Sequence, residues 1–399
     1  MRRIALARAL SAGVTFSGSC ALAFGVYDRT RSAFAVSAVL VATVGASGLV
    51  APLGGWLADR CNRRRLMTSS QLVAGTFLVA LSFAADIRLV VILALAVAAA
   101  QVPFTPASSA AVPSLVMEGQ LCWANGVMAG ATSVGMVVGP AAAGLLLTVG
   151  GTALVFQLNA IALLVSAGFV SSIPGTFDEA RRRGRSKCGA AGFVAILHDA
   201  HLGLLVSAGA LTFVAFGIVI VADPPLASRF GAGPIGYTLL TSVYGAGALS
   251  GGLMASRLLN VRLEGPAFVA GTVLLGVSFA AIAFLPSFIA IVLVGGLGSL
   301  GHGVNVAAWY GLVQRATADS VRGRVIGASQ AFEQCASALA MVAGALLVDE
   351  IGAQLVYVVP GGALAVAAAT AALALKSGPY GSARGTGFVL RKRVDHLGA

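Results

Sequence analysis

A short basic segment between two long apolar runs decides how this chain folds. It reads Gly55-Trp56-Leu57-Ala58-Asp59-Arg60-Cys61-Asn62-Arg63-Arg64-Arg65. The runs on either side, residues 33–57 and 66–85, are each long enough to cross a hydrocarbon layer of about 30 Å as a helix. Because a segment with this much charge is expelled from the layer, it marks a turn on one side of a membrane.

The whole chain has the composition of a membrane protein. Of its 399 residues, 58% are hydrophobic and only 10% are charged, whereas a soluble domain carries about 25% charged residues. The 51 glycines fit as well, because glycine is frequent in membrane helices. The net charge of +12 does not indicate nucleic-acid binding, since the basic residues form short clusters between apolar runs. We therefore expect a lipid bilayer, and no nucleic acid, as the partner of this surface.

Twelve apolar segments are predicted to be membrane-spanning helices, which makes the chain an all-α membrane protein. An even number of spans places both termini on the same side of the membrane. The predicted spans are residues 4–26, 33–57, 66–85, 89–112, 124–148, 152–172, 202–222, 234–256, 265–285, 287–312, 324–348 and 355–375.

The distribution of basic residues predicts the orientation. Twenty-two of the 26 Lys and Arg residues, Arg8 among them, fall on the side of the two termini and the 174–200 loop. Because cytoplasmic loops are enriched in Lys and Arg, both termini and this loop are predicted to lie in the cytoplasm of a bacterial cell, below its inner membrane. The other side carries only Arg29, Arg31, Arg88 and Arg229.

The long loop divides the chain into two similar halves. Residues 54–60 resemble residues 251–257, and residues 143–147 resemble residues 343–347. Two matches at nearly the same offset predict parallel six-helix repeats with a binding site near the midplane between them. The predicted parts are an N-terminal half (1–173), a central cytoplasmic loop (174–200), a C-terminal half (201–376) and a cytoplasmic tail (377–399), and the apolar stretch 193–197 is expected to lie along the membrane surface.

The basic turn resembles the signature loop of the major facilitator superfamily, Gly-x-Leu-Ala-Asp-Arg-x-Gly-Arg-Arg. The resemblance extends over essentially the whole chain and implies the major facilitator fold, with twelve helices in two six-helix repeats. Asn62 stands where the family usually has Gly, and Asn is the next-best residue for a left-handed turn. The alternative is a basic loop that only sets the topology. The resemblance implies a conformational latch on the cytoplasmic side made of Gly55, Asp59, Arg60, Arg63 and Arg64.

The fifth span carries a second motif, which resembles the Gly-x-x-x-Gly-Pro sequence of superfamily exporters. Its glycines would let another helix approach closely. Its proline would bend the helix in its outer half, and this bend would help to seal the outer side of the protein against proton leak. Ordinary packing of small residues is the alternative. The motif residues are Gly135, Gly139, Pro140 and Gly144.

Two further stretches, 103–110 and 314–325, resemble the bacterial branch that contains macrolide-type drug exporters and enterobactin-like siderophore exporters. Two positions depart from that branch. Many relatives carry Arg in span 4 where this chain has Ser108, and an acidic residue in span 1 near Thr15. A known proton pathway therefore does not transfer directly to this chain.

Three titratable residues are candidates for proton coupling. Glu333 is predicted inside span 11, where a carboxylate is costly unless it is neutral, paired or hydrated. The alternative is that it lines a wet cytoplasmic vestibule. His302 in span 10 is either a second coupling group or a neutral, hydrogen-bonded core residue. Asp223, before Pro224-Pro225, is expected at the outer surface of the membrane, where it pairs with Arg229 or with nothing.

The resemblance implies a central cavity lined by the first and fourth helices of each half. The side chains expected there are aromatic or weakly polar, with little fixed charge, which suits an amphipathic ligand better than a sugar or a phosphate. For each of them, plain helix packing is the alternative. They are Phe16, Gln101, Phe104, Thr105, Phe213, Phe216, Asn305, Trp309 and Tyr310.

The function expected from these features is secondary transport, with proton-driven efflux of small amphipathic molecules such as drugs, natural products or siderophores. An importer of a similar solute and a non-transporting membrane sensor are the alternatives. No enzyme, cofactor or metal is expected, because the sequence shows no phosphate-binding loop and no cysteine cluster, and a monomer is expected. The cysteines are Cys20, Cys61, Cys122, Cys188 and Cys335.

Overall fold

The computed structural model describes residues 1–43, 50, 57, 61–116, 121–173, 191–260, 262–317 and 322–377. Every regular element within these ranges is a helix. The first half contains α1 (Arg2–Thr30), a helix over Ala33–Thr43, α3 (Arg63–Ser82), α4 (Ile87–Gln101), α5 (Phe104–Ala111), the short 3-10 helix η1 (Val112–Ser114) and α6 (Leu121–Ser171).

The second half begins after the central loop. It contains α7 (Ala191–His198), α8 (Ala200–Arg229), α9 (Gly233–Leu258), α10 (Glu264–Ile282), α11 (Phe288–Ala316), α12 (Arg322–Ile351), the 3-10 helix η4 (Leu355–Tyr357) and α13 (Val358–Ser377).

Eight helices of the described chain are long and apolar enough to cross a membrane. One of them, α6, holds two of the predicted spans, because Gly150 and Gly151 break its helical path. Gly151 has φ 63°, a conformation that glycine adopts readily. α3 and α9 are helical over two further predicted spans without being among those eight, and Ala33–Thr43 begins another. The prediction of an all-α membrane protein is thus confirmed for the residues that the structure describes.

Prolines at two places affect the predicted spans in opposite ways. The predicted span 89–112 is interrupted at Pro103, which lies between α4 and α5 and has no N–H to continue the hydrogen-bond ladder. The predicted span 202–222 instead continues through Pro224 and Pro225 to Arg229. The predicted end of span seven was therefore wrong, and Asp223 lies within a helix.

Polar caps fix the starts of several helices. The Asn62 side chain accepts a hydrogen bond from the Arg65 N–H at 3.1 Å and so caps α3. Asn62 has φ −60°, so the left-handed turn predicted at this position is wrong. Asp86 caps α4 and Asp199 caps α8 in the same manner.

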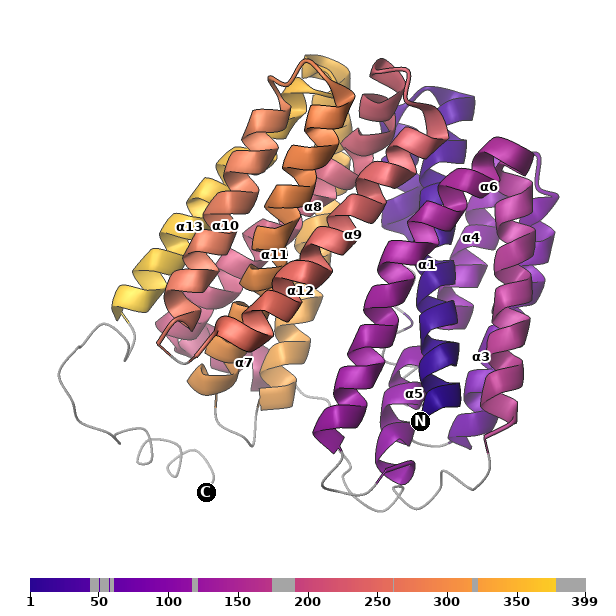
Figure 1. Ribbon diagram of the computed structural model, residues 1–399, viewed down its shortest axis with the longest axis horizontal. Coiled ribbons are helices and arrows are strands. Elements are labelled where there is room, and N and C mark those ends of the chain that lie inside the picture. Colours follow the sequence, from indigo (N-terminus) through magenta and orange to yellow (C-terminus); the bar gives the residue numbers. More distant parts are fainter. Residues whose placement is uncertain are drawn as a thin grey trace.

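The helices form two groups that lie side by side (Figure 1). α1, α3 and α6 pack together in the first group, and α8 packs with α12 and α13 in the second, where α11 packs with α9 and α10. The two groups meet at one end of the bundle and diverge toward the other. We call the end where the groups meet the Arg229 end, and the end where they diverge the Arg2 end.

The buried apolar residues follow the same division. One large core at the Arg229 end contains side chains of both groups, including Val26 of α1 and Leu226 of α8. At the Arg2 end each group has a core of its own, one around Ile4 and Phe104 and the other around Leu205 and Phe268. The halves are therefore joined at the Arg229 end and packed separately at the Arg2 end.

Candidate functional site

Side chains from both halves touch at the Arg229 end. The rings of Phe24 on α1 and Tyr237 on α9 stack with their centroids 6.3 Å apart. Arg31 Nη1 lies 3.5 Å from the hydroxyl of Ser228, which belongs to the last turn of α8. α6 and α9 form the main described contact between the halves.

The glycines of the predicted exporter motif occupy close helix crossings. A Cβ atom on Gly135 would lie 2.5 Å from the Gly13 nitrogen, and one on Gly139 would lie 2.5 Å from the Gly13 oxygen. Gly144 faces Thr238 of α9, where a Cβ atom would collide with the threonine hydroxyl. α6 remains helical at Pro140. The motif thus brings α6 against α1 within one half and against α9 of the other.

The latch residues are only partly described. Gly55, Asp59 and Arg60 lie outside the described residues. Arg63 is buried, and its Nη1 donates a hydrogen bond to the Ala110 carbonyl at 2.9 Å. Arg64 is half-buried.

Asp223 occupies a different environment from the one expected. It is 4% exposed, and the Tyr357 hydroxyl of η4 donates a hydrogen bond to its carboxyl group. Tyr357, Tyr244 and Tyr237 all belong to the apolar core at the Arg229 end, to which Ala222, the neighbour of Asp223, also belongs. The prediction of a surface position beside Arg229 is therefore wrong, because α8 continues past the two prolines.

Glu333 lies on α12 and is also 4% exposed. A Cβ atom on Gly209 of α8 would lie 2.9 Å from its Oε1 and 2.8 Å from Trp309 Nε1. The carboxyl group is thus packed between α8 and α11, and it does not line an open vestibule in this conformation. The neighbouring Gln330 is exposed, and its Nε2 donates to the Tyr310 hydroxyl at 3.2 Å.

His302 lies on α11 beside an aromatic group. Its ring centroid is 4.5 Å from that of Phe216. Nδ1 of His302 is buried and has no hydrogen-bond partner among the residues that the structure describes.

The residues expected in the cavity fall into two sets. Thr15 donates to Gln101 Oε1 at 3.1 Å, Thr105 is exposed, and Phe16, Phe213 and Tyr310 are partly exposed.

Three other cavity predictions are wrong, those of Phe104, Asn305 and Trp309, because each of these side chains is buried against packing partners. Phe104 is 1% exposed within the core around Ile4. Asn305 donates to the Thr272 hydroxyl at 2.5 Å, and Trp309 Nε1 donates to the Leu205 carbonyl at 3.1 Å. Phe216 is partly exposed and packs edge-on against Phe279, so its place in the cavity stays a prediction.

Arg8 joins the site although the sequence placed it among the residues that set topology. Its Nη1 donates to the Ser108 hydroxyl at 2.8 Å and lies 3.4 Å from the Thr105 carbonyl, and its Nε donates to the Thr132 hydroxyl at 3.1 Å. One signal in the sequence could have indicated this role of Arg8. The resemblance described above implies an Arg at the position of Ser108, and this chain lacks it there. The cation is supplied here from α1.

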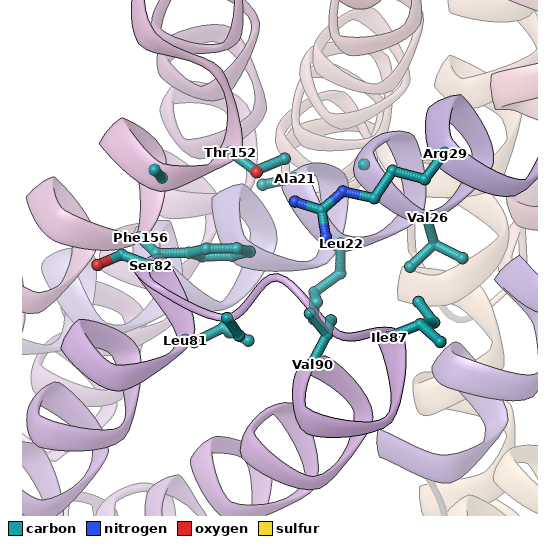
Figure 2. Close-up of a pocket in the computed structure, with 13 residues that line it drawn as sticks. Ala21, Leu22, Val26, Arg29, Leu81, Ser82, Ile87, Val90, Thr152 and Phe156 are labelled. Atoms are coloured by element: carbon teal, nitrogen blue, oxygen red, sulfur yellow. The ribbon is translucent and has the colours of Figure 1, made fainter.

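Two hollows lie toward the Arg229 end. One has a volume of about 60 Å³, and its lining comes from α1, α3, α4 and α6, with Arg29 among the side chains (Figure 2). This volume is too small for an amphipathic substrate. The other, of about 520 Å³, lies between α1, α8 and α12, where Arg31, Arg229 and Asp349 line it. No cluster of metal-ligand side chains occurs within the described ranges.

Comparison with known proteins gives three kinds of likeness. The family model described as Major Facilitator Superfamily matches residues 4–187 and 204–392. A protein of Bacillus amyloliquefaciens named as a bacilysin exporter, BacE, is 27% identical over 317 residues, which is 76% of this chain and 77% of that one. Macrolide efflux protein A of Streptococcus pyogenes is 25% identical over 354 residues, covering 83% of this chain and 85% of its own.

Among solved structures, a mutant of the nucleoside transporter NupG matches with a TM-score of 0.78 at 12% identity, over 94% of this chain and 99% of that one. At this identity the likeness concerns the fold alone.

Proposed function

Because this chain belongs to the Major Facilitator Superfamily, a family of membrane transporters and not of enzymes, we propose that it exports small amphipathic molecules in exchange for protons. The two relatives described above are named as exporters, which supports the direction. The antiport mechanism and the substrate class are our inference from the site.

The proposed orientation places the Arg2 end in the cytoplasm of a bacterial cell, with both termini on that side. The excess of Lys and Arg at this end supports it. In this orientation the conformation described here is closed toward the outside and its halves diverge toward the cytoplasm, which is where an exporter collects its substrate. The division into halves at 1–173 and 201–376 and the monomeric state belong to the same proposal.

The accessible side chains of both halves support an amphipathic substrate. Those of the first half include Phe16, Gln101 and Thr105, and those of the second half include Tyr310 and Gln330, which are hydrogen-bonded to each other. Aromatic surface with a few hydrogen-bonding groups fits molecules that are mainly apolar.

The observation that carries proton coupling is the position of Asp223. This buried carboxyl group accepts a hydrogen bond from Tyr357, which belongs to the same apolar core as Tyr237, and Tyr237 stacks on Phe24 of the opposite half. Ionised carboxylates are costly inside a membrane, so a proton on Asp223 favours the closed Arg229 end. When the halves part at that end, water reaches the carboxyl group and the proton can exchange with the outside. Glu333 is the second candidate, and His302 the third.

The proposal is tested by transport into everted membrane vesicles whose lumen is acidified. The probes are ethidium, erythromycin, dansyl-phenylalanine and dansyl-phenylalanine methyl ester. We expect at least one to accumulate only while the proton gradient is maintained. Accumulation of none of them, or accumulation that ignores the gradient, contradicts the proposal, and uptake in right-side-out vesicles supports import instead.

Asp223→Asn tests the coupling residue in the same assay. The amide cannot exchange a proton, so gradient-driven accumulation is expected to be lost while the protein remains in the membrane. Glu350→Gln is the matched control, because Glu350 is an exposed carboxyl group of α12. Unchanged accumulation by Asp223→Asn assigns coupling elsewhere, and Glu333→Gln is then the variant to compare.

A further inference from the structure

Arg8 is a cation whose described partners are all neutral. They are two hydroxyl groups, of Ser108 and Thr132, and one backbone carbonyl, of Thr105. The two hydroxyls donate their own hydrogens to the carbonyls of Thr105 and Met128. Nothing among these contacts neutralises the positive charge.

Carboxylates of the described first half lie far from Arg8. Asp28 is twenty residues further along α1, which is roughly 30 Å at the rise of a helix. Asp86 caps α4 near the Arg229 end. The partner Thr132 lies roughly 16 Å along α6 from its start at Leu121, and Arg8 lies roughly 9 Å along α1 from Arg2, so the guanidinium group contacts the interior of α6 near the Arg2 end. An arginine packed between membrane helices is costly unless its charge is paired or hydrated.

The contacts of Arg8 differ from those of other arginines in this half. Arg3 donates to the carbonyl of Ser172, just after the last turn of α6, and Arg63 donates to that of Ala110, in the last turn of α5. Cations at helix C-termini satisfy orphan carbonyls and the helix dipole. Arg8 contacts hydroxyls in the interior of α5 and α6, so helix capping does not account for it.

Arg8 and its surroundings are not fully buried. Arg8 itself is partly exposed, and Thr105 is exposed. Gln101 lies four residues before Thr105, and its Oε1 accepts a hydrogen bond from the Thr15 hydroxyl of α1. The Nη2 group of Arg8 makes no hydrogen bond to any residue in the described part of the chain, which leaves its two N–H donors without an acceptor among those residues.

We propose that Arg8 binds a carboxylate of the exported molecule, which makes the preferred substrates amphipathic acids. The inference rests on the proposed export function and adds the substrate class. The Ser108 and Thr132 hydroxyls hold the guanidinium group in place from two sides, and the free Nη2 donates to the anion. A carboxylate supplies the charge that the described protein partners lack, and a charge-assisted hydrogen bond of this kind is among the stronger ones.

The test compares one molecule with and without its charge. Purified protein in lipid nanodiscs is titrated with dansyl-phenylalanine and with its methyl ester, and binding is followed by dansyl fluorescence. We expect the wild-type protein to bind the acid at least about tenfold more tightly than the ester, as expected for one charge-assisted hydrogen bond. In Arg8→Gln the acid should bind no better than the ester, with ester affinity retained.

Two variants serve as controls. Arg8→Lys keeps the charge and should retain part of the preference for the acid. Arg3→Gln removes a cation that has a helix-terminal partner, so it should leave the preference intact. Equal binding of acid and ester by the wild-type protein, or a preference that survives in Arg8→Gln, overturns the inference.

A failure of the inference about Arg8 can be distinguished from a failure of the export proposal. Gradient-driven accumulation of the ester in vesicles keeps the export proposal intact even if Arg8 shows no role. Loss of all accumulation by the wild-type protein removes the export proposal without reference to charge on the probe.

Discussion

Asn305 of α11 shows how a single polar side chain can serve packing in a transporter. Its amide donates to the buried hydroxyl of Thr272 on α10, and its backbone and Cβ lie against Gly271. Arg8 is the opposite case, because it keeps donors that no described protein group accepts. Residue type alone did not separate these two roles, since Asn305 was expected in the cavity and Arg8 was assigned to topology.

Replacing Asn305 by Ala should therefore affect stability and not ligand binding. Loss of the hydrogen bond and of packed volume is expected to cost about 1–3 kcal/mol, visible as a lower midpoint of thermal unfolding in detergent. The affinity for a transported probe should be unchanged. A weakened affinity at unchanged unfolding temperature would return Asn305 to the substrate site.

Among the elements, α6 carries both the close crossing with α1 and the contact with α9. Its glycines are not equivalent. A Cβ atom on Gly139 would meet the Gly13 backbone at 2.5 Å, whereas one on Gly126 would meet nothing within 4 Å. The role of the motif glycines in helix packing can therefore be measured through protein stability, separately from transport.

We expect Gly139→Ala to push α1 and α6 apart, because neither backbone can yield without moving its helix. Overpacking of this kind typically costs about 1–3 kcal/mol, so the unfolding midpoint should fall and transport should slow. Gly126→Ala is the control on the same helix and should match the wild-type protein in both measurements. Equal behaviour of the two variants would show that the crossing is loose.

At the scale of the whole molecule, the two halves share one core at the Arg229 end and have separate cores at the Arg2 end. This arrangement fits alternating access, in which the halves rock about a central site. The contact between Arg31 and Ser228 lies at the joined end.

Linking the halves at that end should stop the transport cycle. In a protein whose native cysteines are replaced by serine, Arg31→Cys with Ser228→Cys is joined by a short bifunctional thiol reagent. Transport into vesicles should fall to the background level and return when a cleavable link is reduced. Full activity of the linked protein would exclude parting of the halves at this end.

The sequence predicted the fold better than it predicted the positions of single side chains. Long apolar runs and clustered charges predicted the helices and the fold, because lipid leaves few alternatives to a helix. The depth of Asp223 was missed, since two prolines normally end a helix and here neighbouring helices cover the continued path. The position of Arg8 was missed because counting charges does not reveal which side chain turns toward Ser108. Such facts depend on tertiary packing, which a single sequence does not display.

The shared core has a thermal consequence. If each transport cycle parts the Phe24 and Tyr237 rings and the apolar side chains around them, water must briefly cover surface that is dry in the closed form. Hydration of apolar surface carries a large heat capacity. A plot of the logarithm of the transport rate against reciprocal temperature should then be curved, because water covers and leaves the apolar surface at the Arg229 end in each cycle.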